Sequence, residues 1–103
     1  MLMVRERVDP VAARLRDLEK ALYGTEHGAG TLMADRLGIS VQRWHNAKSG
    51  RGLSDDVKIR IVQRIPGMTT DWLLFGERRG LSYEMAERLD LFWEGNHDTK
   101  RRR

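Results

Sequence analysis

The amino-acid sequence predicts an all-α protein with five helices and an additional helix near the C-terminus. Two observations lead to this prediction. Apolar residues recur every three or four positions in successive segments, which is the spacing of a buried helix face. Asp, Ser or Thr precedes most of these segments and glycine follows several of them, and these residue types start and end helices.

The first helix is expected at about residues 10–23. Asp9 can accept hydrogen bonds from the free amides of the first turn, and Pro10 is tolerated there because its missing N–H is not needed. The loop at residues 24–30 holds three glycines but lacks the strand and the Lys-Ser/Thr pair of a phosphate-binding loop. The apolar spacing predicts one buried stripe, made of Val11, Leu15, Leu18 and Leu22.

The stretch from Gly30 to Asn46 predicts two short helices, at about residues 31–37 and 41–48, joined by a tight turn. Gly38 lies where the first helix must stop and where a left-handed backbone is favoured. Ser40 can cap the second helix through its hydroxyl. This pattern is the outline of a helix-turn-helix.

The second of these helices is expected to bury Trp44 and to present a polar face. Counting about 100° per residue from the indole places five side chains on the side away from the protein, namely Gln42, Arg43, His45, Asn46 and Ser49. Amide and guanidinium groups are the side chains that read base edges in the major groove of DNA.

Two further helices are expected before residue 77. Ser54 can cap the first, with Asp55 and Asp56 in its first turn, where negative charge suits the helix dipole. Its buried stripe is expected to be Val57, Ile61, Val62 and Ile65, ended by Pro66-Gly67. The second starts at Thr69 or Thr70 and ends at Gly76, and its residues Trp72, Leu73 and Phe75 are expected to cover the core.

A sixth helix, within residues 78–94, begins after Ser82. Its apolar stripe must be covered either by its own domain or by a second copy of the chain, and we expect self-association because the first five helices form a complete core. The predicted dimerisation residues are Met85, Leu89, Phe92 and Trp93. Residues 1–9 are expected to be a loosely packed N-terminal segment. Residues 95–103 are expected to be a basic, disordered tail that either adds nonspecific affinity for DNA or only makes the chain more soluble.

Composition limits the possible functions. The 103 residues suffice for one domain with a single core, which excludes a multidomain enzyme. There is no cysteine for a disulfide or a thiolate metal site, and no apolar run approaches the roughly 18 to 20 residues that span a bilayer. We therefore expect a cytoplasmic protein. The net charge of +4 fits a nucleic-acid ligand only weakly, because four positive charges lie in the last four residues.

Catalytic and metal-binding patterns are missing from the sequence. The three histidines, His27, His45 and His97, have no metal-ligand spacing. Asp55 and Asp56 are adjacent, so on a helix they point about 100° apart, which suits capping better than acid-base catalysis. We expect no catalytic residue, no metal and no cofactor.

Four motifs together carry a resemblance to a known family. They are LMADRLGIS at residues 32–40, QRWHN at 42–46, LS at 53–54 and PGMTTDWLLFGE at 66–77. The set resembles the Cro/lambda-repressor-like helix-turn-helix domains of the xenobiotic-response-element type, found in bacteria, phages and mobile elements. The resemblance covers about residues 10–77. One departure is that Gly30 and Thr31 stand where many members carry a phosphate-binding Gln.

The resemblance implies a sequence-specific transcriptional regulator, expected to be a repressor, that binds a double-stranded DNA operator as a homodimer and is associated with the nucleoid. In this hypothesis the base-reading side chains are Gln42, Arg43, His45 and Asn46. The expected contacts to the DNA backbone come from Thr31, Ser40, Lys48, Ser49 and Arg51.

A competing hypothesis is a protein-interaction module. An anti-activator or antitoxin-like protein would keep the fold but bind a regulatory protein partner through the third or sixth helix. The missing Gln and the acidic pair Asp55-Asp56 near the presumed DNA side favour this alternative.

Overall fold

The computed structural model describes residues 9–51 and 53–92, and this part of the chain contains helices and no strands. The helices are α1 (Pro10–Tyr23), α2 (Ala29–Leu37), α3 (Val41–Lys48), α4 (Asp55–Arg64), α5 (Thr70–Phe75) and α6 (Tyr83–Phe92). The prediction of an all-α protein is confirmed.

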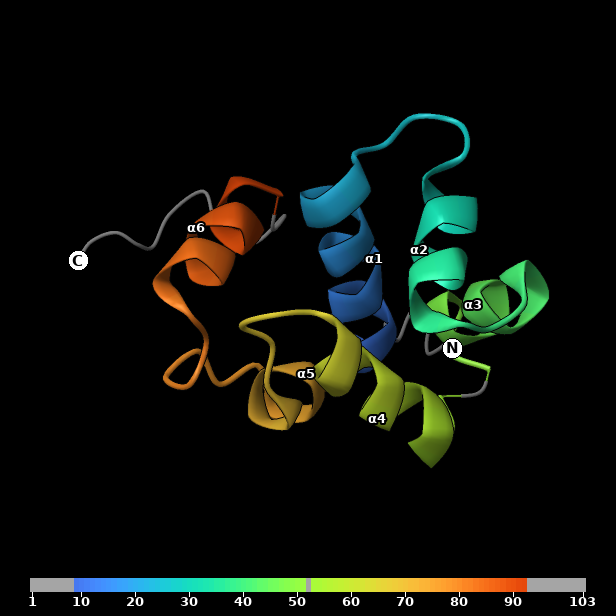
Figure 1. Ribbon diagram of the computed structural model, residues 1–103. Helices are drawn as coiled ribbons and strands as arrows, with labels where there is room; N and C mark the ends of the chain where they lie inside the picture. Colours follow the sequence, from blue (N-terminus) through green and yellow to red (C-terminus); the bar gives the residue numbers. More distant parts are fainter. Residues whose placement is uncertain (1–8, 52, 93–103) are drawn as a thin grey trace, which may run out of the picture.

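Helix α1 is the centre of the structure. Figure 1 shows α2 and α3 on one side of it and α6 on the other, with α4 and α5 at one end. Its residues Leu15 and Leu18 are fully buried in a core to which every helix contributes. The predicted outer members of its stripe, Val11 and Leu22, are only partly buried because they lie at the two ends of the helix.

The predicted cap residues start their helices. The Ser40 hydroxyl accepts a hydrogen bond from the Arg43 amide at 3.1 Å, and the Thr69 hydroxyl accepts one from the Trp72 amide at 3.0 Å. The same arrangement is found for the remaining caps at Asp9, Ser54 and Ser82. Each cap satisfies an amide that has no partner within its helix.

The start of α2 and the position of Phe75 differ from the predictions. Helix α2 begins at Ala29, two residues before the predicted start, because Gly28 takes a left-handed conformation with φ 99° and Ala29 is then buried. Phe75 does not cover the core, since it is 75% exposed at the last position of α5, while Trp72 and Leu73 are buried as expected.

Helix α6 is covered by its own chain. Met85 and Leu89, predicted to form a dimer face, are buried in the same core as α1, and α6 packs against α1. The expectation that five helices make a complete core is therefore wrong, because the sixth helix closes one side of α1. The side chain of Phe92, all of Trp93, the N-terminal segment at 1–8 and the tail at 95–103 lie outside the described residues.

None of the helices in the described ranges is long and apolar enough to cross a membrane.

Candidate nucleic-acid interface

Helices α2 and α3 and the turn between them form a rigid unit. Gly38 ends α2 in the left-handed region, with φ 74°, and its amide donates to the carbonyl of Asp35. The next amide, that of Ile39, donates back to Ala34 at 3.0 Å, which fixes the direction in which α3 starts. A Cβ atom at position 38 would lie 2.9 Å from a guanidinium nitrogen of Arg60. Glycine is thus favoured there by its backbone conformation, while the guanidinium is the movable end of a side chain and could shift to make room.

One face of α3 is buried and the opposite face is open. Trp44 and Ala47 are buried beneath the helix. The side chains predicted to point away do so, since Gln42, Arg43, His45 and Ser49 are exposed and Asn46 is partly exposed. We call this set of five residues the polar strip. The polarity of α3 therefore follows the spacing read from the sequence.

The side-chain amides of Gln42 and Asn46 are hydrogen-bonded to each other. The Gln42 side-chain nitrogen donates to the Asn46 side-chain oxygen at 3.1 Å, one helical turn apart. Among the described residues, the Gln42 side-chain oxygen and the Asn46 side-chain nitrogen have no hydrogen-bond partner, so one acceptor and one donor are left for a ligand. Adenine presents the complementary pair of groups in the major groove.

The indole of Trp44 is anchored to α1 by Glu19. The Glu19 carboxylate accepts from the indole N–H at 2.5 Å and from the Lys48 ammonium at 2.8 Å. The side chains of Glu19 and Lys48 are only 14% and 16% exposed. The ammonium also lies 5.9 Å from the centre of the indole ring, within range of a cation–π attraction. Lys48 was expected to contact the DNA backbone, but in the structure its ammonium is paired with Glu19 within the domain.

Two of the three hydroxyls expected to contact DNA are also hydrogen-bonded within the chain. Ser40 caps α3, and the Ser49 hydroxyl donates to the Asn46 carbonyl at 3.0 Å. Arg16 of α1 donates to the Lys48 carbonyl at 2.6 Å and so satisfies the other end of α3. Thr31, Ser40, Ser49 and Arg51 are all exposed, but of the five predicted backbone-contacting residues only Thr31 and Arg51 have side chains without a hydrogen bond to another described residue.

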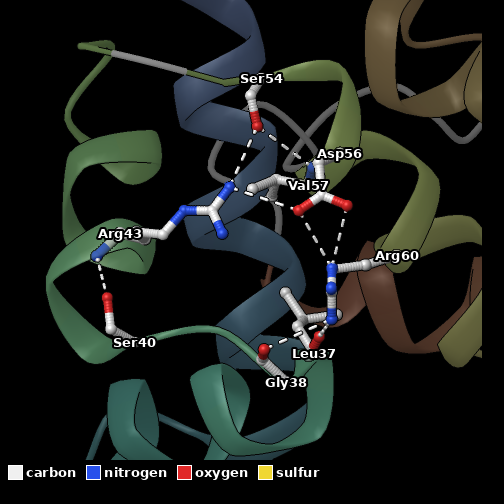
Figure 2. Close-up of polar contacts among 8 residues, drawn as sticks. All are labelled: Leu37, Gly38, Ser40, Arg43, Ser54, Asp56, Val57 and Arg60. Atoms are coloured by element: carbon white, nitrogen blue, oxygen red, sulfur yellow. Dashed lines mark hydrogen bonds and ion pairs between the residues drawn. The ribbon is translucent and has the colours of Figure 1, made fainter.

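Arg43 is turned toward the start of α4. Its Nη2 donates to the Ser54 hydroxyl and to the Asp56 carboxylate, both at 3.4 Å, as Figure 2 shows. Asp56 in turn accepts from Arg60 Nε at 3.1 Å on both of its oxygens. The sequence indicated that Asp56 lies near the presumed DNA side, but neither spacing nor charge predicted that it contacts Arg43.

The same network reaches the turn between α2 and α3. Arg60 Nη1 donates to the carbonyls of Leu37 and Gly38, at 3.0 and 3.3 Å, so one guanidinium joins the α4 carboxylate to the end of α2 (Figure 2). The hydrogen bond from Arg60, reinforced by the charges of Arg60 and Arg43, lowers the pKa of Asp56 below its usual value. Asp56 is therefore a fixed negative charge beside the polar strip.

No three His, Cys, Asp or Glu side chains within residues 9–51 and 53–92 come together as metal ligands do. Comparison with protein-family models, curated proteins and solved structures found no match.

Proposed function

We propose that the protein is a sequence-specific DNA-binding transcriptional regulator with a helix-turn-helix of the Cro/lambda-repressor-like type. Helix α3 is the proposed recognition helix, and the partner is the major groove of an operator. The observation that carries the proposal is the exposed polar strip on a helix held by a buried indole, which is the arrangement that a groove-reading helix requires.

The chemistry of the strip supports base reading rather than general attraction to phosphates. Amides at positions 42 and 46 and a guanidinium at position 43 are suited to adenine and guanine, respectively. The imidazole ring of His45 lies beside Gly30 at the start of α2. A Cβ atom added at Gly30 would be 3.4 Å from that ring. Backbone contacts are assigned to Thr31 and Arg51, which flank the strip and are exposed.

The regulator is proposed to act in the cytoplasm as a repressor and as a homodimer on an inverted repeat. Two short recognition helices related by a twofold axis would read half-sites about one DNA turn apart. The dimer face is not assigned to Met85 and Leu89, because both are buried within the chain.

A binding titration with paired variants tests the proposal. Duplexes selected from a random library are titrated at two salt concentrations against the parent protein, Gln42→Ala and Arg51→Ala. Gln42→Ala is expected to lose about 1 to 3 kcal/mol on the selected duplex only, and Arg51→Ala to weaken every duplex and flatten the salt dependence. Equal losses on selected and random DNA for Gln42→Ala would show that α3 does not read bases.

A second candidate function is a protein-interaction module, and a specific observation favours it. Asp55 is 90% exposed and Asp56 is about half exposed, so the start of α4 places negative charge next to the strip. Such charge repels phosphates and attracts a basic protein surface. If the pure protein selects no sequence and shows no salt-dependent duplex binding, this second function replaces the first.

A further inference from the structure

The contact between Arg43 and Asp56 bears on which base the protein selects, and the inference drawn from it rests on the proposed function. Arg43 is the one guanidinium of the polar strip, and α4 supplies its partner from outside the helix-turn-helix. Their side chains are 46% and 51% exposed, so both are accessible to a ligand.

The hydrogen bonds of Arg43 leave part of its guanidinium open. Both of its contacts to the described residues, to Ser54 and to Asp56, start from Nη2. Ser54 offers a neutral hydroxyl whereas Asp56 offers a carboxylate, so the contact with Ser54 is the easier one to displace. Once that contact is released, an Nη2 hydrogen and a neighbouring nitrogen form a fork of two donors, while Asp56 keeps the group in place.

Asp56 is itself held in place before any ligand arrives. Both of its oxygens accept from Arg60, and Arg60 is tied to the carbonyls of Leu37 and Gly38. A flexible surface carboxylate would lose conformational freedom when it oriented an arginine. Asp56 has already lost that freedom to Arg60, so it can orient Arg43 at a smaller entropic cost.

We propose that Asp56 is a positioning residue that makes Arg43 specific for guanine. A phosphate bound to the same guanidinium would approach the Asp56 carboxylate, and the two anions would repel each other. The O6 and N7 atoms of guanine are neutral acceptors that fit a two-donor fork. The carboxylate therefore disfavours phosphate and leaves guanine as the favoured ligand, at the cost of weaker binding to all DNA.

The test measures base preference and general affinity separately. Duplexes are selected from a random library by the parent protein, and each position of the selected site is then substituted and titrated. The parent protein should prefer guanine at one position in each half-site by about 5- to 150-fold, the range of one two-donor contact. Asp56→Asn should reduce that preference at least several-fold, leave the other positions unchanged, and bind random duplex several-fold more tightly.

The neighbouring Asp55 provides a matched control. Asp55→Asn makes the same change of charge on the same helix turn, but Asp55 pairs with Lys58 and not with Arg43. It should leave the guanine preference unchanged. Arg43→Lys should keep binding to random duplex and lose the guanine preference, because an ammonium has no planar fork. In an Arg43→Lys background, Asp56→Asn should have no further effect on base preference.

The outcomes separate the two proposals. If the parent protein selects a site but Asp56→Asn changes base preference no more than Asp55→Asn does, the positioning role is overturned and the proposed function stands. If the parent protein binds no duplex selectively, the proposed function fails and the inference fails with it. Circular dichroism shows whether each variant is folded. Asp56→Glu keeps the negative charge, so it should retain part of the guanine preference that Asp56→Asn loses.

Discussion

Removal of the Glu19 carboxylate tests the anchor beneath α3. In Glu19→Ala the Trp44 indole N–H and the Lys48 ammonium both lose their hydrogen-bond acceptor. Both groups are mostly shielded from solvent, so water replaces the acceptor only in part. A hydrogen bond to a charged group contributes about 1.5 to 3 kcal/mol, and breaking a fully buried ion pair costs about 3 to 5 kcal/mol.

The expected loss for Glu19→Ala lies between those cases. Because the two charged side chains retain 14% and 16% exposure, water can partly solvate Lys48 after the change. We expect the free energy of unfolding to fall by about 2 to 4 kcal/mol. For a domain of this size each kcal/mol corresponds to roughly 4 to 8 °C, so the melting temperature should fall by about 8 to 32 °C.

Urea unfolding followed by circular dichroism measures this loss. Glu19→Gln keeps an acceptor for the indole but removes the charge that pairs with Lys48, so it should lose less, about 1 to 2 kcal/mol. The matched control is Glu26→Ala in the exposed loop before α2, which should change stability by less than about 0.5 kcal/mol. A Glu19→Ala protein as stable as Glu26→Ala would show that Glu19 does not anchor α3.

Three further predictions follow from the packing and the charges. Leu89→Ala should lose about 2 to 5 kcal/mol independently of protein concentration; an effect on self-association instead, seen by sedimentation, would contradict burial within one chain. Gly38→Ala should lose about 1 to 2 kcal/mol because of its positive φ, whereas Gly30→Ala, inside α2, should gain about 0.5 kcal/mol in urea unfolding. Because its pKa is lowered, Asp56 contributes stability that is present above pH about 4 and is lost on further acidification. The difference in stability between the parent protein and Asp56→Asn should therefore shrink steadily as the pH falls below about 4, and a difference that does not change with pH would refute the pairing.

The helix boundaries were predictable because caps and stops act locally. Asp9, Ser40, Ser54 and Thr69 each bond an amide two or three residues away, so neighbouring sequence carries the whole signal. The start of α2 was missed because Gly28 has no side chain to act as a cap, and its role comes from a left-handed backbone. A glycine-rich stretch does not indicate which of its glycines takes that conformation.

The candidate site was predictable in its orientation but not in its pairings. A helical period of about 100° is enough to separate the buried Trp44 from the exposed Gln42 and Arg43. The partners of Lys48 and Arg43 lie 29 residues earlier and 13 residues later in the chain. Such contacts depend on how helices cross, and no local pattern encodes them. The burial of Leu89 was mispredicted for the same reason, because an apolar stripe does not show which surface covers it.

The two anchors of α3 differ in a way that assigns them different tasks. The contact with α1 through Glu19 is short and nearly dry, so it resists salt and holds the C-terminal half of α3 at a constant angle. The contact with α4 through Asp56 is longer and half exposed, so ions and a ligand can compete for it. The proposed recognition of DNA by α3 would need both properties, since the helix axis must stay fixed while a side chain that contacts a base exchanges partners. Salt should therefore break the contact between Arg43 and Asp56 at concentrations that leave the surroundings of the Trp44 indole unchanged. Near-ultraviolet circular dichroism reports on the indole, and nuclear magnetic resonance reports on the Arg43 guanidinium, so the two measurements together would separate the two responses.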